Sequence, residues 1–217
     1  MISKDKVKSE ILRCGFVPII RTDNSKAAVQ VAGAIRDGGA PLLEITMTVP
    51  AALDIIKEIA DTFAGTVLVG AGTILDSETA RLAILAGADF IVAPILDVAT
   101  IRLCHRYSKI IMPGALTPTE ILQAWEMGAD FVKVFPADAL GGPAYIKAVK
   151  APLPQVDLIP TGGVDIDTAT DFIRAGASAV GVGGALVDKQ IIASSDWKRL
   201  TQKTEEFLQT ISAARQG

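Results

Sequence analysis

The chain has 217 residues, of which 50% are apolar, 5% are aromatic and 21% are charged, and its net charge is −3. This charge balance, without a basic block, argues against nucleic acid as a partner, and no apolar run reaches the about 18 residues that a membrane helix needs. Two cysteines cannot build a disulfide framework, and the charged start of the chain is unlike a signal peptide. We therefore expect a cytoplasmic protein without a membrane partner.

Short apolar runs alternate with helical patterns along the chain. The first helical pattern places Val7, Ile11 and Leu12 on one face. Eight near-continuously apolar runs follow, as expected for strands that are buried on both faces, at 16–21, 41–46, 66–73, 89–94, 110–115, 130–136, 156–163 and 178–184. Helical patterns such as 25–39, 76–88 and 117–129 separate them, and the last of these begins with Thr117 as a cap and Glu120 three residues later. A final helical pattern carries Trp197, Leu200, Phe207, Leu208 and Ile211.

Eight strand–helix units joined by short connections predict the fold. They favour an α/β protein with a single (β/α)₈ barrel domain over 1–217 and an extra N-terminal helix. The rival is an open, doubly wound sheet, which would need a G-x-G-x-x-G motif after the first strand. The chain has RTDNSK there, without a glycine. The barrel is therefore the predicted architecture, with its chemistry at the carboxyl ends of the strands.

Lys133 and Glu44 are charged residues in the middle of apolar strand runs, where an unpaired charge is costly. Lys133 lies in FVKVFP, and a desolvated amine has a lowered pKa, so its neutral form can attack a ketone. Alternatively, Lys133 reaches solvent or pairs with a carboxylate. Glu44 lies in PLLEIT and is a candidate general acid or base, or only the ion-pair partner of Lys133. A bridging water would reconcile the two roles, because direct pairing would raise the lysine pKa.

Other residues at strand ends indicate an anion site. Arg21 ends the first run and suits a carboxylate or phosphate. Two glycine pairs end the last two runs, Gly162–Gly163 and Gly183–Gly184, where such barrels bind phosphate through backbone N–H groups. Thr73 and Pro94 end the third and fourth runs and are candidate pocket residues.

The single histidine argues against a metal site. His105 has only Cys104 beside it as a possible metal ligand, and two adjacent residues do not form a metal-binding set. We expect a surface histidine on a helix, and neither Cys14 nor Cys104 has a histidine placed to activate it.

Ordered motifs along nearly the whole chain resemble one family. They are VPIIR, LEIT, GAGT, PGALTPTE, FVKVFPA, PTGGV and VGVGGALV, and they resemble the 2-keto-3-deoxy-6-phosphogluconate (KDPG) / 4-hydroxy-2-oxoglutarate (KHG) aldolases, a class I family of (β/α)₈ barrels. The resemblance implies that Lys133 forms a Schiff base and that Glu44 is the general acid/base. It places Arg21, Thr73, Pro94, Phe135 and Thr161 around the keto acid, and Gly162, Gly163, Gly183 and Gly184 around the phosphate.

Two positions depart from the family pattern. Many relatives have an arginine, which helps to hold the substrate carboxylate, where this chain has Thr48. Many also have a serine where Gly184 stands. Carboxylate anchoring then falls to hydroxyls, backbone groups or Arg21, and the phosphate loop keeps only backbone donors.

The resemblance implies cleavage of KDPG to pyruvate and D-glyceraldehyde 3-phosphate, as in the Entner–Doudoroff pathway, and also of KHG to pyruvate and glyoxylate. It implies a homotrimer with no metal or other cofactor. Three alternatives stay open: an aldolase for the galactonate epimer or a related sugar acid, a phosphosugar isomerase or epimerase, and a non-enzymatic anion-binding barrel. Metal-dependent epimerases need several histidines, which this chain lacks.

Overall fold

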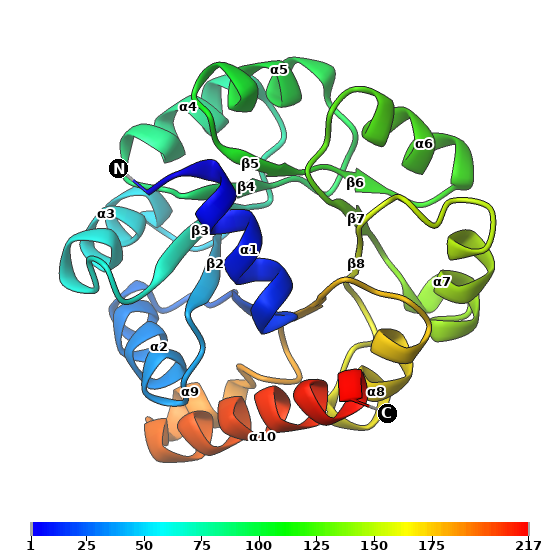
Figure 1. The fold of residues 1–217 in the computed structure, drawn as a ribbon. Coiled ribbons are helices and arrows are strands. Elements are labelled where there is room, and N and C mark those ends of the chain that lie inside the picture. Colours follow the sequence, from blue (N-terminus) through cyan, green and yellow to red (C-terminus); the bar gives the residue numbers. More distant parts are fainter. Residues whose placement is uncertain (1, 217) are drawn as a thin grey trace.

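A computed structural model describes residues 2–216 and shows a ring of parallel strands surrounded by helices (Figure 1). The strands within this range are β1 (Phe16–Ile20), β2 (Leu42–Thr46), β3 (Leu68–Gly72), β4 (Phe90–Val92), β5 (Ile110–Met112), β6 (Gly114–Ala115), β7 (Val132–Val134), β8 (Leu158–Pro160) and β9 (Val180–Val182). Every residue of these strands is buried, which explains why each run is apolar along its whole length.

The helices alternate with the strands. They are α1 (Lys4–Cys14), α2 (Ser25–Asp37), α3 (Ala52–Thr62), α4 (Ser77–Leu85), α5 (Val98–Arg106), α6 (Pro118–Glu126), α7 (Pro143–Lys150), α8 (Ile166–Arg174), α9 (Lys189–Ser194) and α10 (Trp197–Gln216), with a short 3₁₀ turn η1 (Asp138–Leu140). The predicted cap of α6 is present, because the Thr117 side chain accepts the Glu120 N–H and the Glu120 side chain accepts the Thr117 N–H. Within residues 2–216, none of these helices is long and apolar enough to cross a membrane.

Strand pairing closes the barrel and differs from the prediction in one place. The order is β5-β4-β3-β2-β1-β9 in one sheet and β6-β7-β8 in the other. The run 110–115 is not one strand: Pro113 separates β5, which pairs with β4, from β6, which pairs with β7. Proline has no N–H for the ladder, so the run changes partner there and joins the two sheets. A bridge between Thr161 and Gly181 joins β8 to β9. The predicted (β/α)₈ fold is confirmed.

Helix α1 covers one end of the ring, as Figure 1 shows. Its lysines pair with aspartates that stand just before strands: Lys4 Nζ lies 2.8 Å from Asp130 Oδ1, and Lys8 Nζ lies 3.6 Å from Asp157 Oδ2. These contacts place α1 at the amino-terminal mouth, and its predicted face buries Val7 and Ile11. The carboxyl ends of the strands are therefore the free end of the barrel.

Helix α10 packs on the outside of the barrel and contacts the end of α1. It packs against α2 and α8, and the Phe207 ring stacks on the Phe16 ring of β1 with 5.2 Å between centroids. Arg215 donates hydrogen bonds to the carbonyl oxygens of Leu12, Arg13 and Ser178. The predicted apolar face of this helix is confirmed, because Leu200, Phe207 and Ile211 are buried and Trp197 and Leu208 pack against the core.

Candidate active site

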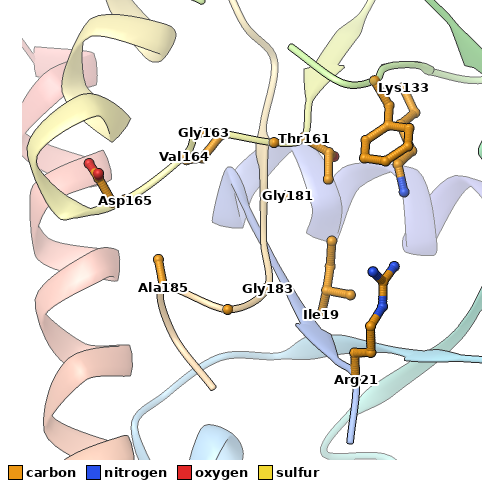
Figure 2. A pocket seen from close by; sticks show the side chains of 13 residues that line it. Ile19, Arg21, Lys133, Thr161, Gly163, Val164, Asp165, Gly181, Gly183 and Ala185 are labelled. Atoms are coloured by element: carbon orange, nitrogen blue, oxygen red, sulfur yellow. The ribbon is translucent and has the colours of Figure 1, made fainter. Parts of the chain in front are cut away.

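A cavity of about 340 Å³ lies at the carboxyl ends of the strands (Figure 2). Its lining includes eight of the residues predicted from the sequence, namely Arg21, Lys133, Phe135, Thr161, Gly162, Gly163, Gly183 and Gly184. They lie on or just after β1, β7, β8 and β9, which are distant in the chain and adjacent in the barrel. The fold therefore gathers most of the predicted site around one cavity.

Lys133 lies in the middle of β7, and only 6% of it is exposed. Its Nζ lies 5.2 Å from the centroid of the Phe135 ring. In Figure 2 the amine points into the same space as the Arg21 guanidinium. Over residues 2–216, no carboxylate lies within salt-bridge distance of this amine. The amine is thus buried and faces the cavity without a carboxylate partner.

Glu44 lies in the middle of β2 and is only 1% exposed. Its Oε1 is buried and has no hydrogen-bond partner in the part of the chain that the structure describes. Burial raises the pKa of Glu44, while the positive charges of Lys133 and Arg21 lower it by a smaller amount. A carboxyl group with a raised pKa can exchange a proton nearer to neutral pH than an ordinary one.

Two glycine-containing turns form the other wall of the cavity. Gly162 and Gly163 have φ of +99° and +66°, a conformation that favours glycine. Within residues 2–216, the N–H groups of Gly162, Gly163, Gly183 and Gly184 have no backbone acceptor. Such free amides can donate hydrogen bonds to an anion, and the binding of an anion here stays a prediction.

Asp165 also lines the cavity, and the sequence interpretation missed it. It caps α8, since its Oδ1 accepts the N–H groups of Asp167 and Thr168 at 3.1 and 2.8 Å. The hydrogen bonds from Thr168 lower the pKa of Asp165, so its side chain is anionic at neutral pH. The helix N-terminus is therefore already satisfied by a carboxylate, and an anion here would depend on the loop amides. An aspartate just before a helical pattern was the sequence signal for this cap.

Four predicted residues do not line this cavity: Glu44, which lies inside β2, and three residues that follow strands. Thr48 follows β2 and is exposed, Thr73 follows β3 with φ of 59°, and Pro94 follows β4 and is half-buried. The carboxyl ends of β3 and β4 lie across the barrel from β8 and β9, whereas only β1 separates β2 from β9. A role at the rim stays a prediction for Thr48, Thr73 and Pro94.

The remaining candidates lie outside the cavity. His105 is exposed on α5, with Nε2 3.0 Å from the Gly128 carbonyl oxygen, which confirms the predicted surface position. Burial raises the pKa of Cys14 to about 11 and that of Cys104 to about 12, so both remain thiols at neutral pH. Residues 2–216 contain no cluster of three or more histidine, cysteine or acidic residues that could hold a metal ion.

Comparison with known proteins identifies the family. The sequence model of the KDPG and KHG aldolases matches residues 7–203. The chain belongs to this family. A 2-dehydro-3-deoxy-phosphogluconate aldolase of Haemophilus influenzae is 35% identical to this aldolase over 90% of the chain and 92% of its own length. A 2-dehydro-3-deoxy-6-phosphogalactonate aldolase of Escherichia coli is 32% identical over 92% of the chain and 95% of its own length.

A solved structure agrees with this assignment. The KDPG aldolase of Legionella pneumophila, with pyruvate captured as a covalent carbinolamine, is 26% identical and has a TM-score of 0.85 over 91% of this chain and 96% of that one. The predicted family is confirmed, and the chain is a KDPG/KHG aldolase-type lyase. The two named substrates of its relatives differ, so membership alone leaves the sugar acid open.

Proposed function

We propose that this aldolase is a class I enzyme that forms a Schiff base on Lys133 and uses neither a metal nor another cofactor. The observation that carries the proposal is the buried Lys133 amine, which faces the cavity and has no carboxylate partner in the described part of the chain. The neutral form of an amine is the nucleophile, and an amine that faces the cavity can reach the C2 ketone of a bound keto acid.

The reaction follows from the groups around this amine. The Lys133 Nζ attacks the C2 ketone of a 2-keto-4-hydroxy acid, and the resulting carbinolamine loses water to give an iminium ion. Glu44, directly or through a water molecule, removes the C4 hydroxyl proton. The electrons of the C3–C4 bond then move to the iminium, which becomes an enamine, and an aldehyde leaves. Protonation of the enamine at C3 and hydrolysis release pyruvate and restore the lysine.

The proposed substrate is KDPG, which gives pyruvate and D-glyceraldehyde 3-phosphate, with KHG as a further substrate. The name of the Haemophilus influenzae relative and the free amides of the two glycine turns support this choice. The galactonate epimer is a second candidate, because the Escherichia coli relative is named for it. Thr48 and Gly184 replace the arginine and the serine with which many relatives hold the carboxylate and the phosphate. The preferred sugar acid is therefore determined by direct assay.

A pyruvate-release assay tests the proposal. It compares KDPG, its galactonate epimer, KHG and an unphosphorylated 2-keto-3-deoxy acid. Pyruvate release from KDPG that is lost in Lys133→Ala supports the proposal. Activity on a phosphosugar that survives Lys133→Ala would favour the isomerase or epimerase, and ligand binding with no cleavage of any substrate would favour a non-enzymatic barrel.

We also propose that the aldolase is a homotrimer. Several large apolar side chains are exposed, at Leu75, Leu82, Leu85, Ile95, Trp125, Met127 and Leu140, and contact with another copy would remove such groups from water. A designed protein cage built by fusing symmetric oligomeric domains is 31% identical to this chain, which covers 73% of that chain. Light scattering of the purified protein should give three times the chain mass of 22.7 kDa, and a monomer would contradict the proposal.

A further inference from the structure

Gly72 lies against the Glu44 carboxylate. Strands β2 and β3 are parallel neighbours, in which Glu44 pairs with Gly70 and Thr46 pairs with Gly72. A Cβ atom added at Gly72 would lie 1.7 Å from Glu44 Oε1 and 2.3 Å from its Cδ. Such distances are impossible for non-bonded atoms. The Glu44 carboxylate therefore occupies the space that any side chain at position 72 would need.

Space rather than backbone conformation requires the glycine at position 72. Gly72 is not among the glycines of the described chain with positive φ, so another residue could adopt its backbone angles. Gly70, on the same strand and the same face, shows the contrast, because its missing side chain makes room for the Phe90 ring. The Phe90 ring is a packing group, whereas the group over Gly72 is a buried carboxylate. A glycine inside a strand weakens it, so its presence calls for such a reason.

Neighbouring contacts hold both Gly72 and Glu44 in place. The Gly72 carbonyl oxygen accepts a hydrogen bond from the Met47 N–H at 2.8 Å, which ties the end of β3 to β2. On the other side of β2, the Thr46 hydroxyl donates to the Ile20 carbonyl oxygen at 3.3 Å. Glu44 is only 1% exposed, so its carboxylate cannot swing into solvent without leaving the barrel interior. A side chain at position 72 would therefore move the carboxylate within the site.

We propose that Gly72 is a positioning residue, which sets where the Glu44 carboxylate stands relative to the Lys133 adduct. This inference rests on the proposed role of Glu44 in proton transfer. Proton transfer depends on hydrogen-bond distance, and a misplacement of about 1 Å can cost about 10²-fold in rate. Gly72→Ala should consequently leave Schiff-base formation on Lys133 intact and slow the proton-transfer steps.

The experiment compares Gly72→Ala with Gly33→Ala as a matched control. Gly33 lies in α2, where an added Cβ would meet the Phe63 ring at an ordinary 3.7 Å. Three quantities are measured for each variant: the mass of the borohydride-trapped pyruvate adduct on Lys133, kcat for pyruvate release, and the pH dependence of kcat. We expect Gly72→Ala to form the adduct, to lose about 10²-fold in kcat, and to shift the acidic limb of the pH profile. Gly33→Ala should match the unmodified protein in all three.

A second set of variants keeps the test decisive even if Gly72→Ala folds poorly. In Glu44→Ala the carboxylate is absent, so Gly72→Ala added to it should fold and should change kcat by less than about twofold. Glu44→Asp has a shorter side chain and should recover part of the activity of Gly72→Ala, although it lowers kcat by itself. The proposal is overturned if Gly72→Ala keeps the kcat and pH profile of the unmodified protein, or if it costs as much in the Glu44→Ala background as alone. An unmodified protein that forms no adduct would instead refute the proposed function.

Discussion

The hydroxyl oxygens of Thr46 and Thr48 lie 2.8 Å apart where the chain leaves β2. Thr46 is buried and also contacts the Ile20 carbonyl oxygen, so it holds the Thr48 hydroxyl at the rim of the barrel. Residues 46–48, at this exit, carry no charged side chain. Arg21 and Lys133 are the two basic side chains of the described chain that line the cavity. Lys133 is needed as the nucleophile, so binding of a carboxylate there falls to the Arg21 guanidinium.

Thr48→Arg should strengthen binding of the keto acid. An arginine at this exposed position adds a guanidinium on the β2 side of the rim, and a charge-assisted hydrogen bond to a carboxylate contributes about 1.5–3 kcal/mol. We expect the KM for the 2-keto acid to fall about tenfold or more, with kcat nearly unchanged. Steady-state kinetics checks this, with Thr48→Gln as a neutral control of similar length. Equal KM values for Thr48→Arg and Thr48→Gln would show that Thr48 does not face the carboxylate.

Gly184→Ser should favour phosphorylated substrates. Gly184 is exposed beside the cavity, and no atom beyond its chain neighbours lies within 4 Å of where its Cβ would be, so a serine fits without strain. Its hydroxyl adds one donor for a phosphate, which contributes about 1.5 kcal/mol. The KM for KDPG should fall several-fold relative to that for the unphosphorylated analogue, and Gly184→Ala should leave this ratio unchanged. A ratio that is the same in Gly184→Ser would place the phosphate elsewhere.

Glu44→Gln should lower activity and raise stability at neutral pH. Loss of the proton-transfer group should reduce kcat by about 10²–10⁴-fold while the Lys133 adduct still forms. Burial raises the Glu44 pKa, so the folded state holds this proton more tightly than the unfolded chain does. The free energy of unfolding therefore falls as pH rises above the unfolded-state pKa of about 4.3.

Glutamine carries no such charge, and its advantage over glutamate should appear above this pH and vanish at about pH 4. Chemical denaturation of both proteins between pH 4 and 7 measures the difference. A stability advantage for the unmodified protein that grows toward pH 7 would show that the Glu44 charge is stabilised in the fold.

Thr73→Gly should raise the free energy of unfolding slightly and lower the activity. Thr73 has φ of 59°, and a β-branched residue in this left-handed region is strained by about 1–3 kcal/mol. Glycine relieves the strain at an entropic cost of up to about 1 kcal/mol, so the free energy of unfolding should rise slightly. The activity should fall, because the hydroxyl at the rim is lost. Ala51→Gly, at φ of 56° and before α3, is the control and should change stability alone. Unchanged activity in Thr73→Gly would remove Thr73 from the site.

Local signals explain why much of the fold could be predicted. Strands that are buried on both faces need apolar residues throughout, so the eight runs stand out from the helices. The Thr117–Glu120 capping box depends only on residues within one turn, and the structure contains it. Lys133 and Glu44 stand out for the opposite reason, since a charge inside such a run needs an explanation, and both lie buried in the barrel interior near the cavity.

Features that depend on contacts between strands could not be predicted. The split of 110–115 at Pro113 reflects a change of neighbour from β4 to β7, which only the closed barrel creates. The need for glycine at position 72 depends on how the Glu44 side chain turns across to β3. Thr73 and Pro94 were singled out by their strand-end positions and Thr48 by the family resemblance, and all three follow strands at the rim. Strand-end position does not determine which rim residues line a given cavity, and these three do not line the one beside Lys133.

The central claim is that Lys133 carries the chemistry, and covalent trapping tests it most directly. The protein is incubated with pyruvate, reduced with borohydride, digested and sequenced by mass spectrometry. Lys109→Ala is the control variant. Lys109 is another largely buried lysine, and it pairs with Asp89 at the amino-terminal end of the barrel. We predict one reduced pyruvate adduct per chain, on Lys133, which persists in Lys109→Ala and disappears in Lys133→Ala. No adduct in an active enzyme, or an adduct on another lysine, would contradict the account.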